Sequence, residues 1–411
     1  MENPQRDIQV YLSLKQLKIT FENRVLKFLD KYGNTDFRLA IITVGLIILT
    51  GGDALIIIHN KFTNLSTSPT WLHLEKQSHG ILTTQSNYPV AHHVSKLTFR
   101  LVAPLLGKLC FECNLLALAH FLIALEYTSG FVFILLFIKF LKQYVPDIVT
   151  VRWLTICLSF MFLGKIFFWD LGYFDGFALV SMFIGMTSNS IPIQFFFYSA
   201  AFWTDERSLL SVPLIWIWYL LRNDIKINTQ AESTPFYLSF KIKKGHWALL
   251  LSIAAMIFGR WILIHFYSFP TKVDFAQLAK EAIHILKNGR LVKLSPFLLF
   301  SSFESLWVII LLAFYIIWKN STKPEFIVLI IASMLSIGSA FLVADITRSI
   351  MYSFPLLIIA IRIVAVYLPI NQLRKICFYI MLFAMIYPTY YMTDYLFPFF
   401  LKAIITKKGL Y

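Results

Sequence analysis

Charged residues are scarce in this chain. Lys, Arg, Asp and Glu make up 14% of its 411 residues, whereas 58% are hydrophobic and 17% are aromatic. A soluble domain carries about 25% charged residues, so the shortage excludes a water-soluble globule. The apolar residues form long blocks between short charged connectors, for example 114–140, 247–266 and 350–370. Because about 20 apolar residues in a helix cross a bilayer, the sequence predicts a polytopic α-helical membrane protein.

Acidic residues are the scarcer of the two charged types. The chain has 22 Asp and Glu against 37 Lys and Arg, which gives a net charge of +15. A basic excess is also typical of nucleic-acid-binding proteins. Here, however, the Lys and Arg lie mainly between the apolar blocks, which is the inside-positive pattern of membrane proteins. We therefore expect membrane lipid, and no nucleic acid, as the partner of these bases.

Cysteine is also rare, with four residues in the whole chain. Cys157 lies within a predicted span and Cys377 lies beside one, which excludes a disulfide scaffold. Cys110 and Cys113 have the spacing of a metal or redox site, but there is no second pair to complete a zinc site. We interpret these two residues as incidental thiols at a membrane boundary.

The chain divides into two parts. Residues 1–37 mix Lys and Arg with apolar residues at helical spacing, and no small-residue cleavage site follows them. We expect a cytoplasmic amphipathic segment that lies against anionic headgroups. Residues 38–411 are expected to form the transmembrane domain, with two long extracytoplasmic loops near 57–113 and 267–296.

The transmembrane domain is expected to be an all-α helix bundle of about 11 spans, within a range of about 10–12. The spans are expected near 38–56, 114–140, 152–169, 174–189, 191–203, 208–222, 246–267, 298–318, 325–344, 349–369 and 376–393. A last apolar stretch, 396–405, is either a twelfth short span or an interfacial helix.

Acidic residues gather at the predicted outer ends of the spans. Asp53 follows two glycines at the end of the first span, and Asp170 and Asp175 lie in one tight outer turn. Carboxylates at membrane depth are costly and usually mark a site. Two carboxylates across a short turn can converge on one cation or one hydroxyl, although they are also common as solvated turn residues. We predict that Asp53, Asp170 and Asp175 are the catalytic residues.

A second set of outer residues is expected to bind the phosphate or the acceptor of a substrate. Its members are Arg100, Arg348, Asp345, Glu206, Arg207, His92 and His93. Arg348 follows Asp345 by three residues on one helical face, so the two either neutralise each other or leave Arg348 to bind a phosphate. Glu206 and Arg207 lie in another outer turn, where they cap a helix or bind an anion.

The order of these features resembles the glycosyltransferase C superfamily over about residues 38–350. The likeness rests on a cytoplasmic N-terminus, the first-loop acid Asp53, an acidic turn after the third span and a second long loop after the seventh. The stretches 89–106, 205–214 and 345–348 are similar to ones in poorly characterised bacterial members. The resemblance implies an enzyme of the bacterial inner membrane. Such an enzyme transfers a sugar from a polyprenyl-phosphate-linked donor to a hydroxyl of a glycan or lipid acceptor on the outer face.

The resemblance also implies roles for the acidic residues. Asp53 corresponds to the first-loop acid, which acts as a base or a metal ligand in the superfamily, while Asp170 and Asp175 correspond to the second acidic turn. The leaving phosphate would be stabilised by an arginine, or by Mg²⁺ or Mn²⁺ held by Asp53 and Asp175.

Two other functions remain open from the sequence. A flippase or transporter of lipid-linked sugars should have acids spread through the membrane depth and broken helices in paired halves. In this sequence only Glu126 is clearly central, which counts against a transporter. We interpret Glu126 as a hydrogen-bonded polar residue that faces the bundle. A non-catalytic membrane subunit of an envelope glycan assembly would tolerate replacement of the outer acids.

Overall fold

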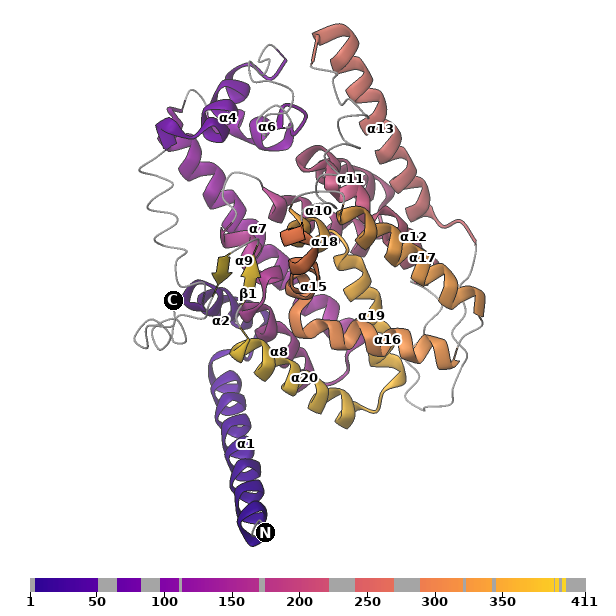
Figure 1. Ribbon diagram of the computed structural model, residues 1–411. Helices are drawn as coiled ribbons and strands as arrows, with labels where there is room; N and C mark the ends of the chain where they lie inside the picture. The colour runs from indigo at the N-terminus through magenta and orange to yellow at the C-terminus, as the bar shows by residue number, and fades with distance from the viewer. Residues whose placement is uncertain are drawn as a thin grey trace.

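Helices dominate the structure, which is a computed structural model of the chain (Figure 1). It describes residues 4–50, 65–82, 97–110, 113–169, 174–221, 241–269, 289–320, 323–341, 345–387, 389–391 and 394–396. In the first half of the chain the helices are α1 (Pro4–Tyr32), α2 (Asp36–Thr50), η1 (Leu65–Thr67), α4 (Pro69–His79), α6 (Val102–Gly107), η2 (Lys108–Cys110), α7 (Leu115–Tyr144), α8 (Ile148–Cys157), η3 (Leu158–Phe160), α9 (Phe162–Trp169), α10 (Asp175–Thr187) and α11 (Ile191–Thr204).

The described part of the second half continues in the same way, and its last two elements are short strands. Its elements are η4 (Glu206–Ser211), α12 (Val212–Leu221), α13 (Lys244–Tyr267), α15 (Gly289–Phe303), η5 (Glu304–Leu306), α16 (Trp307–Asn320), α17 (Lys323–Ala340), α18 (Ile346–Met351), α19 (Phe354–Tyr367), α20 (Ile370–Ile386), β1 (Thr389–Tyr391) and β2 (Asp394–Leu396). The two strands pair antiparallel. The predicted all-α class is confirmed apart from this hairpin.

Among the described residues, four helical segments are long and apolar enough to cross a membrane. They are Leu115–Tyr144, Lys244–Tyr267, Pro296–Asn320 and Lys323–Ala340. The pair Ile148–Phe160 and Phe162–Phe168 adds a fifth if it is one span with a bend of 58°. These helices bear out a membrane protein, while the division into about 11 spans stays a prediction.

Several predicted spans are shorter or more broken than expected. At about 1.5 Å per residue, the 13 residues of α10 and the 14 of α19 extend about 20 Å, less than a hydrocarbon core of about 30 Å. The predicted span 208–222 is divided between η4 and the short α12. The last predicted span, 376–393, ends early because Pro388 follows Tyr387 and disfavours helix there.

The described parts of the two predicted outer loops are largely helical. The described parts of 57–113 include η1, α4, α6 and η2, and α15 begins at Gly289, inside the predicted second loop. Cys110 and Cys113 form a disulfide with a Cα–Cα distance of 5.6 Å. The interpretation of these cysteines as incidental thiols was therefore wrong. Sequence spacing alone does not distinguish a closed pair from free thiols.

The N-terminal segment is helical, and α1 extends away from the lower end of the bundle in Figure 1. Lys18 Nζ donates a hydrogen bond to the Tyr379 hydroxyl at 3.0 Å and also lies over the rings of Phe378 and Tyr379. Arg152 Nη1 in α8 contacts Asp30 Oδ1 at 2.6 Å. The segment predicted as a membrane-surface helix is thus attached to α20 and α8 of the bundle.

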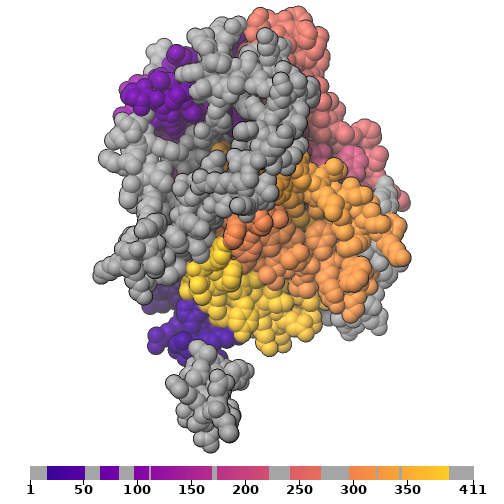
Figure 2. Space-filling view, in the orientation of Figure 1, coloured from indigo at the N-terminus to yellow at the C-terminus, as the bar shows by residue number. Residues whose placement is uncertain are grey.

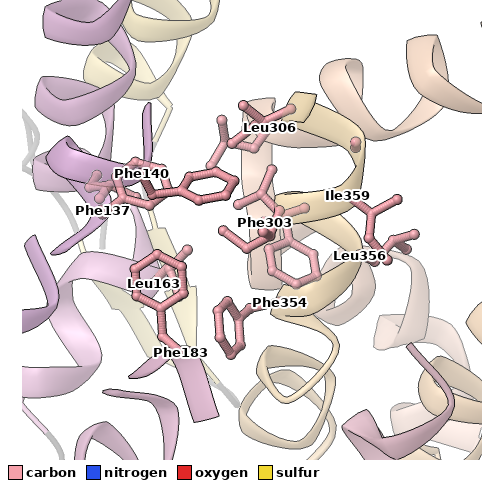
Figure 3. Close-up of a cluster of buried hydrophobic side chains, with 14 of the residues drawn as sticks. Phe137, Phe140, Leu163, Phe183, Phe303, Leu306, Phe354, Leu356 and Ile359 are labelled. Carbon is pink, nitrogen blue, oxygen red and sulfur yellow. The ribbon is translucent and has the colours of Figure 1, made fainter. Parts of the chain in front are cut away.

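The core is built from aromatic and branched side chains of helices far apart in sequence. Figure 3 shows Phe137 and Phe140 of α7, Leu163 of α9, Phe183 of α10 and Phe354 of α19 facing one another. Within a bilayer, close packing rather than removal from water holds helices together.

The molecular surface is shown in Figure 2, where residues of the last third of the chain, coloured orange and yellow, form its lower right.

Candidate functional site

Eight charged side chains form one connected group where α10, α11 and α18 meet near the centre of Figure 1. We call it the arginine–carboxylate cluster, and its members are Asp175, Asp205, Glu206, Asp345, Arg100, Arg207, Arg260 and Arg348.

Asp175, the first residue of α10, lies at the centre of this cluster and is fully buried. Its Oδ1 accepts hydrogen bonds from the Tyr352 hydroxyl at 2.8 Å and from Arg207 Nη2 at 2.9 Å. Its Oδ2 accepts one from Arg348 Nε at 2.5 Å. Charge-assisted hydrogen bonds of this kind are short and strong, so they fix both arginines around one carboxylate.

The start of α10 is fixed by backbone conformation and by α7. Phe174 precedes the helix with a left-handed φ of 58°. The Gly176 N–H donates to Glu126 Oε1 of α7 at 3.1 Å. A Cβ at Gly176 would lie 2.5 Å from the same oxygen, so only glycine allows this approach. The interpretation of Glu126 as a hydrogen-bonded residue facing the bundle is confirmed, and this residue positions Asp175.

Arg207 links Asp175 to a second buried carboxylate, Asp205. Asp205 lies between α11 and η4, and its Oδ1 accepts the Arg207 backbone N–H at 2.9 Å. Arg207 Nη2 also reaches Asp205 Oδ2 at 2.6 Å. Burial alone would raise the pKa of the Asp205 carboxyl, but Arg100 and Arg207 outweigh burial and hold that pKa well below its usual range.

Arg100, Arg260 and Glu206 form the arm of the cluster that ends in its two most exposed members, Arg260 and Glu206. Arg100 Nη1 lies 3.0 Å from Asp205 Oδ2, and its Nη2 lies 3.3 Å from Glu206 Oε1. Arg260 of α13 lies 3.8 Å from Glu206 Oε2 and stacks 5.0 Å above the Phe99 ring. Within the described part of the chain, the buried Arg260 Nε has no hydrogen-bond partner.

Asp345 closes the other side of the cluster. Its Oδ2 lies 2.9 Å from Arg348 Nη1 and 3.7 Å from Arg207 Nη1. The pair three residues apart that the sequence singled out therefore does form, but Arg348 also binds Asp175. Neither of the two sequence interpretations, a self-contained pair or a free phosphate ligand, describes this shared arrangement.

The charges of the cluster balance, and its exposure changes from one end to the other. Four carboxylates face four guanidinium groups, so their formal charges sum to zero. The Asp175 and Asp205 side chains are 0% exposed, whereas Arg260 and Glu206 are 28% and 33% exposed. Arg260 and Glu206 are therefore the most exposed members of the cluster.

Six of the ten predicted site residues belong to the cluster, namely Asp175, Arg100, Arg348, Asp345, Glu206 and Arg207. The other four, Asp53, Asp170, His92 and His93, lie outside the described residues. Arg260 and Tyr352 are contributors that sequence reasoning missed. Arg260 had a usable signal, because it is the one arginine of the apolar helix α13 and charged residues within membrane helices often mark a site.

The predicted metal site finds little support at Asp175. Both of its oxygens already accept hydrogen bonds, and a cation there would have to displace an arginine. Among the described residues, no three His, Cys, Asp or Glu side chains are grouped so that they could hold a metal ion. Because Asp53 lies outside these residues, the use of Mg²⁺ or Mn²⁺ stays a prediction.

Comparison of the chain with protein-family models, curated proteins and solved structures gave no match.

Proposed function

We propose that the protein is an integral membrane glycosyltransferase that moves a sugar from a polyprenyl-phosphate-linked donor to an acceptor hydroxyl on the outer face of a bacterial inner membrane. The observation that carries this proposal is the meeting of six sequence-selected residues from four separate segments in one cluster. Buried charges are costly unless they are paired, and groups of them at the ends of membrane helices commonly mark a functional site.

The exposed arm of the cluster suits the phosphate of such a donor. Arg260 has a long contact with its carboxylate, 3.8 Å to Glu206, and a guanidinium binds phosphate in a bidentate manner. Arg100 lies beside the same carboxylate. A phosphate that binds here takes the place of the Glu206 carboxylate beside the two arginines. One anion replaces another, so the two guanidinium groups keep an anionic partner.

Asp175 then acts as a positioning residue, since it holds Arg207 and Arg348 in the buried part of the cluster. In the proposed reaction, an acceptor hydroxyl gives its proton to Asp53 as its oxygen bonds to the anomeric carbon. The bond between that carbon and the phosphate oxygen breaks, and the lipid phosphate leaves as an anion. The arginines stabilise this anion.

The disulfide supports the outer face as the side of the cluster. Disulfides persist in oxidising compartments, and Cys110 belongs to the same described segment, 97–110, as Arg100. At the other end of α7, about 45 Å away by helical rise, Lys142 pairs with Asp36. Basic residues at that end fit a cytoplasmic side.

A transporter is less well supported, although charged side chains do lie deep within the bundle. Glu126 accepts the Gly176 N–H, and Glu304 accepts the Phe162 N–H at 3.0 Å. Arg362 stacks on the rings of Tyr144 and Trp218. These contacts join helices to one another, which suits a structural role better than a path for a substrate.

The test is transfer from polyprenyl-phosphate sugars by the full-length protein in liposomes. We expect Asp53→Asn to reduce kcat by about 100-fold or more, because a positioned base contributes about that much. Arg260→Gln should raise KM for the donor. Lys319→Gln, which changes an exposed cation at the end of α16, is the matched control and should transfer normally.

Two results would overturn the proposal. One is full transfer by both the Asp53 and Arg260 variants. The other is a wild-type protein that moves lipid-linked sugars across the bilayer without forming a glycosidic bond, which would identify a flippase.

A further inference from the structure

Three polar atoms between α4 and the segment 97–100 are buried without a partner. Within the described part of the chain, His73 Nε2, Gln77 Oε1 and Thr98 Oγ1 have no hydrogen bond. The residues themselves are 4%, 0% and 0% exposed. Buried polar side-chain atoms usually have a protein or water partner, so three such atoms together require an explanation.

The three residues lie on two segments that contact each other, α4 and 97–100. His73 and Gln77 are four residues apart in α4 and therefore lie on the same face of the helix. Gln77 Nε2 donates to the Thr98 carbonyl oxygen at 2.7 Å. This bond fixes the orientation of the Gln77 amide, so its Oε1 remains an acceptor.

The chemistry of the three atoms matches a hydroxyl-rich ligand. Gln77 Oε1 accepts a hydrogen bond, and Thr98 Oγ1 both donates and accepts. Burial, and to a lesser extent Lys76, lowers the pKa of His73, so its ring is neutral and its Nε2 donates or accepts according to the tautomer. A sugar hydroxyl can serve as donor and acceptor at once, whereas a phosphate lacks the donors that Gln77 needs.

The group also lies beside the arginine–carboxylate cluster. Thr98 is two residues before Arg100, which binds Asp205 and Glu206. Phe99, between them, lies under the Arg260 guanidinium. A ligand whose phosphate contacts Arg100 and Arg260 would therefore have its next chemical group close to Thr98.

We propose that His73, Gln77 and Thr98 form a subsite for the ring hydroxyls of a sugar, carried either by the donor lipid or by the acceptor. The inference rests on the proposed function, because it takes the neighbouring arginines as the phosphate site. The three residues are buried in this structure, so a ligand binds them only after α4 and the segment 97–100 have moved apart locally.

The decisive variant is Thr98→Val, which keeps the side-chain shape and removes the hydroxyl. We expect KM for the sugar-bearing substrate to rise about three- to tenfold, the effect of one hydrogen bond, with kcat nearly unchanged. Separate titrations of donor and acceptor identify which substrate carries the sugar that binds. Because the variant also removes a buried unpaired group, it should unfold at a higher temperature than the wild type.

The matched control is Ser78→Ala in the same helix, since the Ser78 hydroxyl already donates to the Leu74 carbonyl oxygen at 2.8 Å. It should change neither KM by more than about twofold, because it removes no group facing the ligand. A Thr98→Val protein that is more stable but has unchanged KM for both substrates would overturn the subsite. Such a result would mean that the Thr98 hydroxyl is buried without a partner and binds no substrate.

A binding measurement separates this inference from the proposed function. If the wild type transfers no sugar, the amide hydrogens of α4 are followed by exchange in the presence of polyprenyl-phosphate sugars, sugar-free polyprenyl phosphate or methyl glycosides. If only the sugar-bearing compounds protect the amides of α4, and Thr98→Val loses that protection, the subsite is supported even though the protein transfers no sugar. Equal exchange under all conditions refutes the subsite.

Discussion

Asp175→Asn tests whether one carboxylate holds the cluster together. Asparagine keeps the shape of the side chain but replaces one oxygen by an amide that can only donate. Oδ1 faces Tyr352 and Arg207, and Oδ2 faces Arg348, so either orientation of the amide sets a donor against at least one donor. The variant also leaves the cluster with four guanidinium groups and three carboxylates.

The size of the effect follows from burial. Removal of one partner from a buried ion pair costs about 3–5 kcal/mol, because an uncompensated charge remains. Arg207 keeps Asp205 and Arg348 keeps Asp345 as second partners. We therefore expect the free energy of unfolding to fall by about 3 kcal/mol, at the lower end of that range.

The assay is reversible unfolding in mixed detergent micelles, with Asp30→Asn as the control. Asp30 also pairs with an arginine, at 2.6 Å, but its side chain is 66% exposed, and exposed pairs contribute about 0–1 kcal/mol. In the double variant Asp175→Asn/Arg348→Met the charges balance again. Its destabilisation should be smaller than the sum of the two single effects by about 1–2 kcal/mol.

The reasoning fails if Asp175→Asn unfolds within about 0.5 kcal/mol of the wild type, or if the double variant is strictly additive. Either result would mean that the arginines do not depend on this carboxylate and that the cluster is a set of independent pairs.

Three further predictions concern other parts of the molecule. Gly176→Ala should destabilise the protein by about 2–4 kcal/mol in the same assay, whereas Gly45→Ala, with no atom within 4 Å of the new Cβ, should be neutral or stabilising by up to about 1 kcal/mol. Burial opposes ionisation of Asp147, but hydrogen bonds from Arg374 and Thr150 lower its pKa. The stability from this pair is therefore present above about pH 4 and lost at lower pH, and Arg374→Leu should make the acid-induced loss measured in pH titrations shallower. Mass spectrometry after alkylation should find the Cys110–Cys113 pair unlabelled until a reductant is added. Labelling without reductant would contradict the disulfide.

The helical class was predictable from the sequence because the apolar blocks are long and the charges lie between them. The breaks were harder to predict. The bend between η3 and α9 occurs within continuous apolar sequence, and the change from α15 to η5 occurs at Glu304 in an otherwise mainly apolar stretch. They are set by contacts from other helices, such as the Glu304 carboxylate that accepts the Phe162 N–H. Hydrophobic periodicity carries no information about such long-range contacts.

The candidate site could be predicted in part, for a physical reason. In a chain this apolar, a carboxylate or guanidinium near a membrane span is costly unless it has a partner, so position alone selected Asp175, Arg207 and Arg348. Tyr352 gave no such signal, because it is one of 19 tyrosines and only the fold brings it to Asp175. The ion pair between Asp175 and Arg348 could not be predicted either, since the two residues are 173 positions apart in the sequence.

The attachment of α1 to α20 has a consequence for how the chain is made. Lys18 and Tyr379 are separated by 361 residues, and a ribosome adds about 5–20 residues per second. The first helix therefore emerges tens of seconds before the helix on which it docks. During that interval Lys18 lacks the Tyr379 hydroxyl and the two rings over which it lies, and the nearby membrane surface is available to hold it. The docking of α1 on α20 is thus completed only after residue 379 has been made.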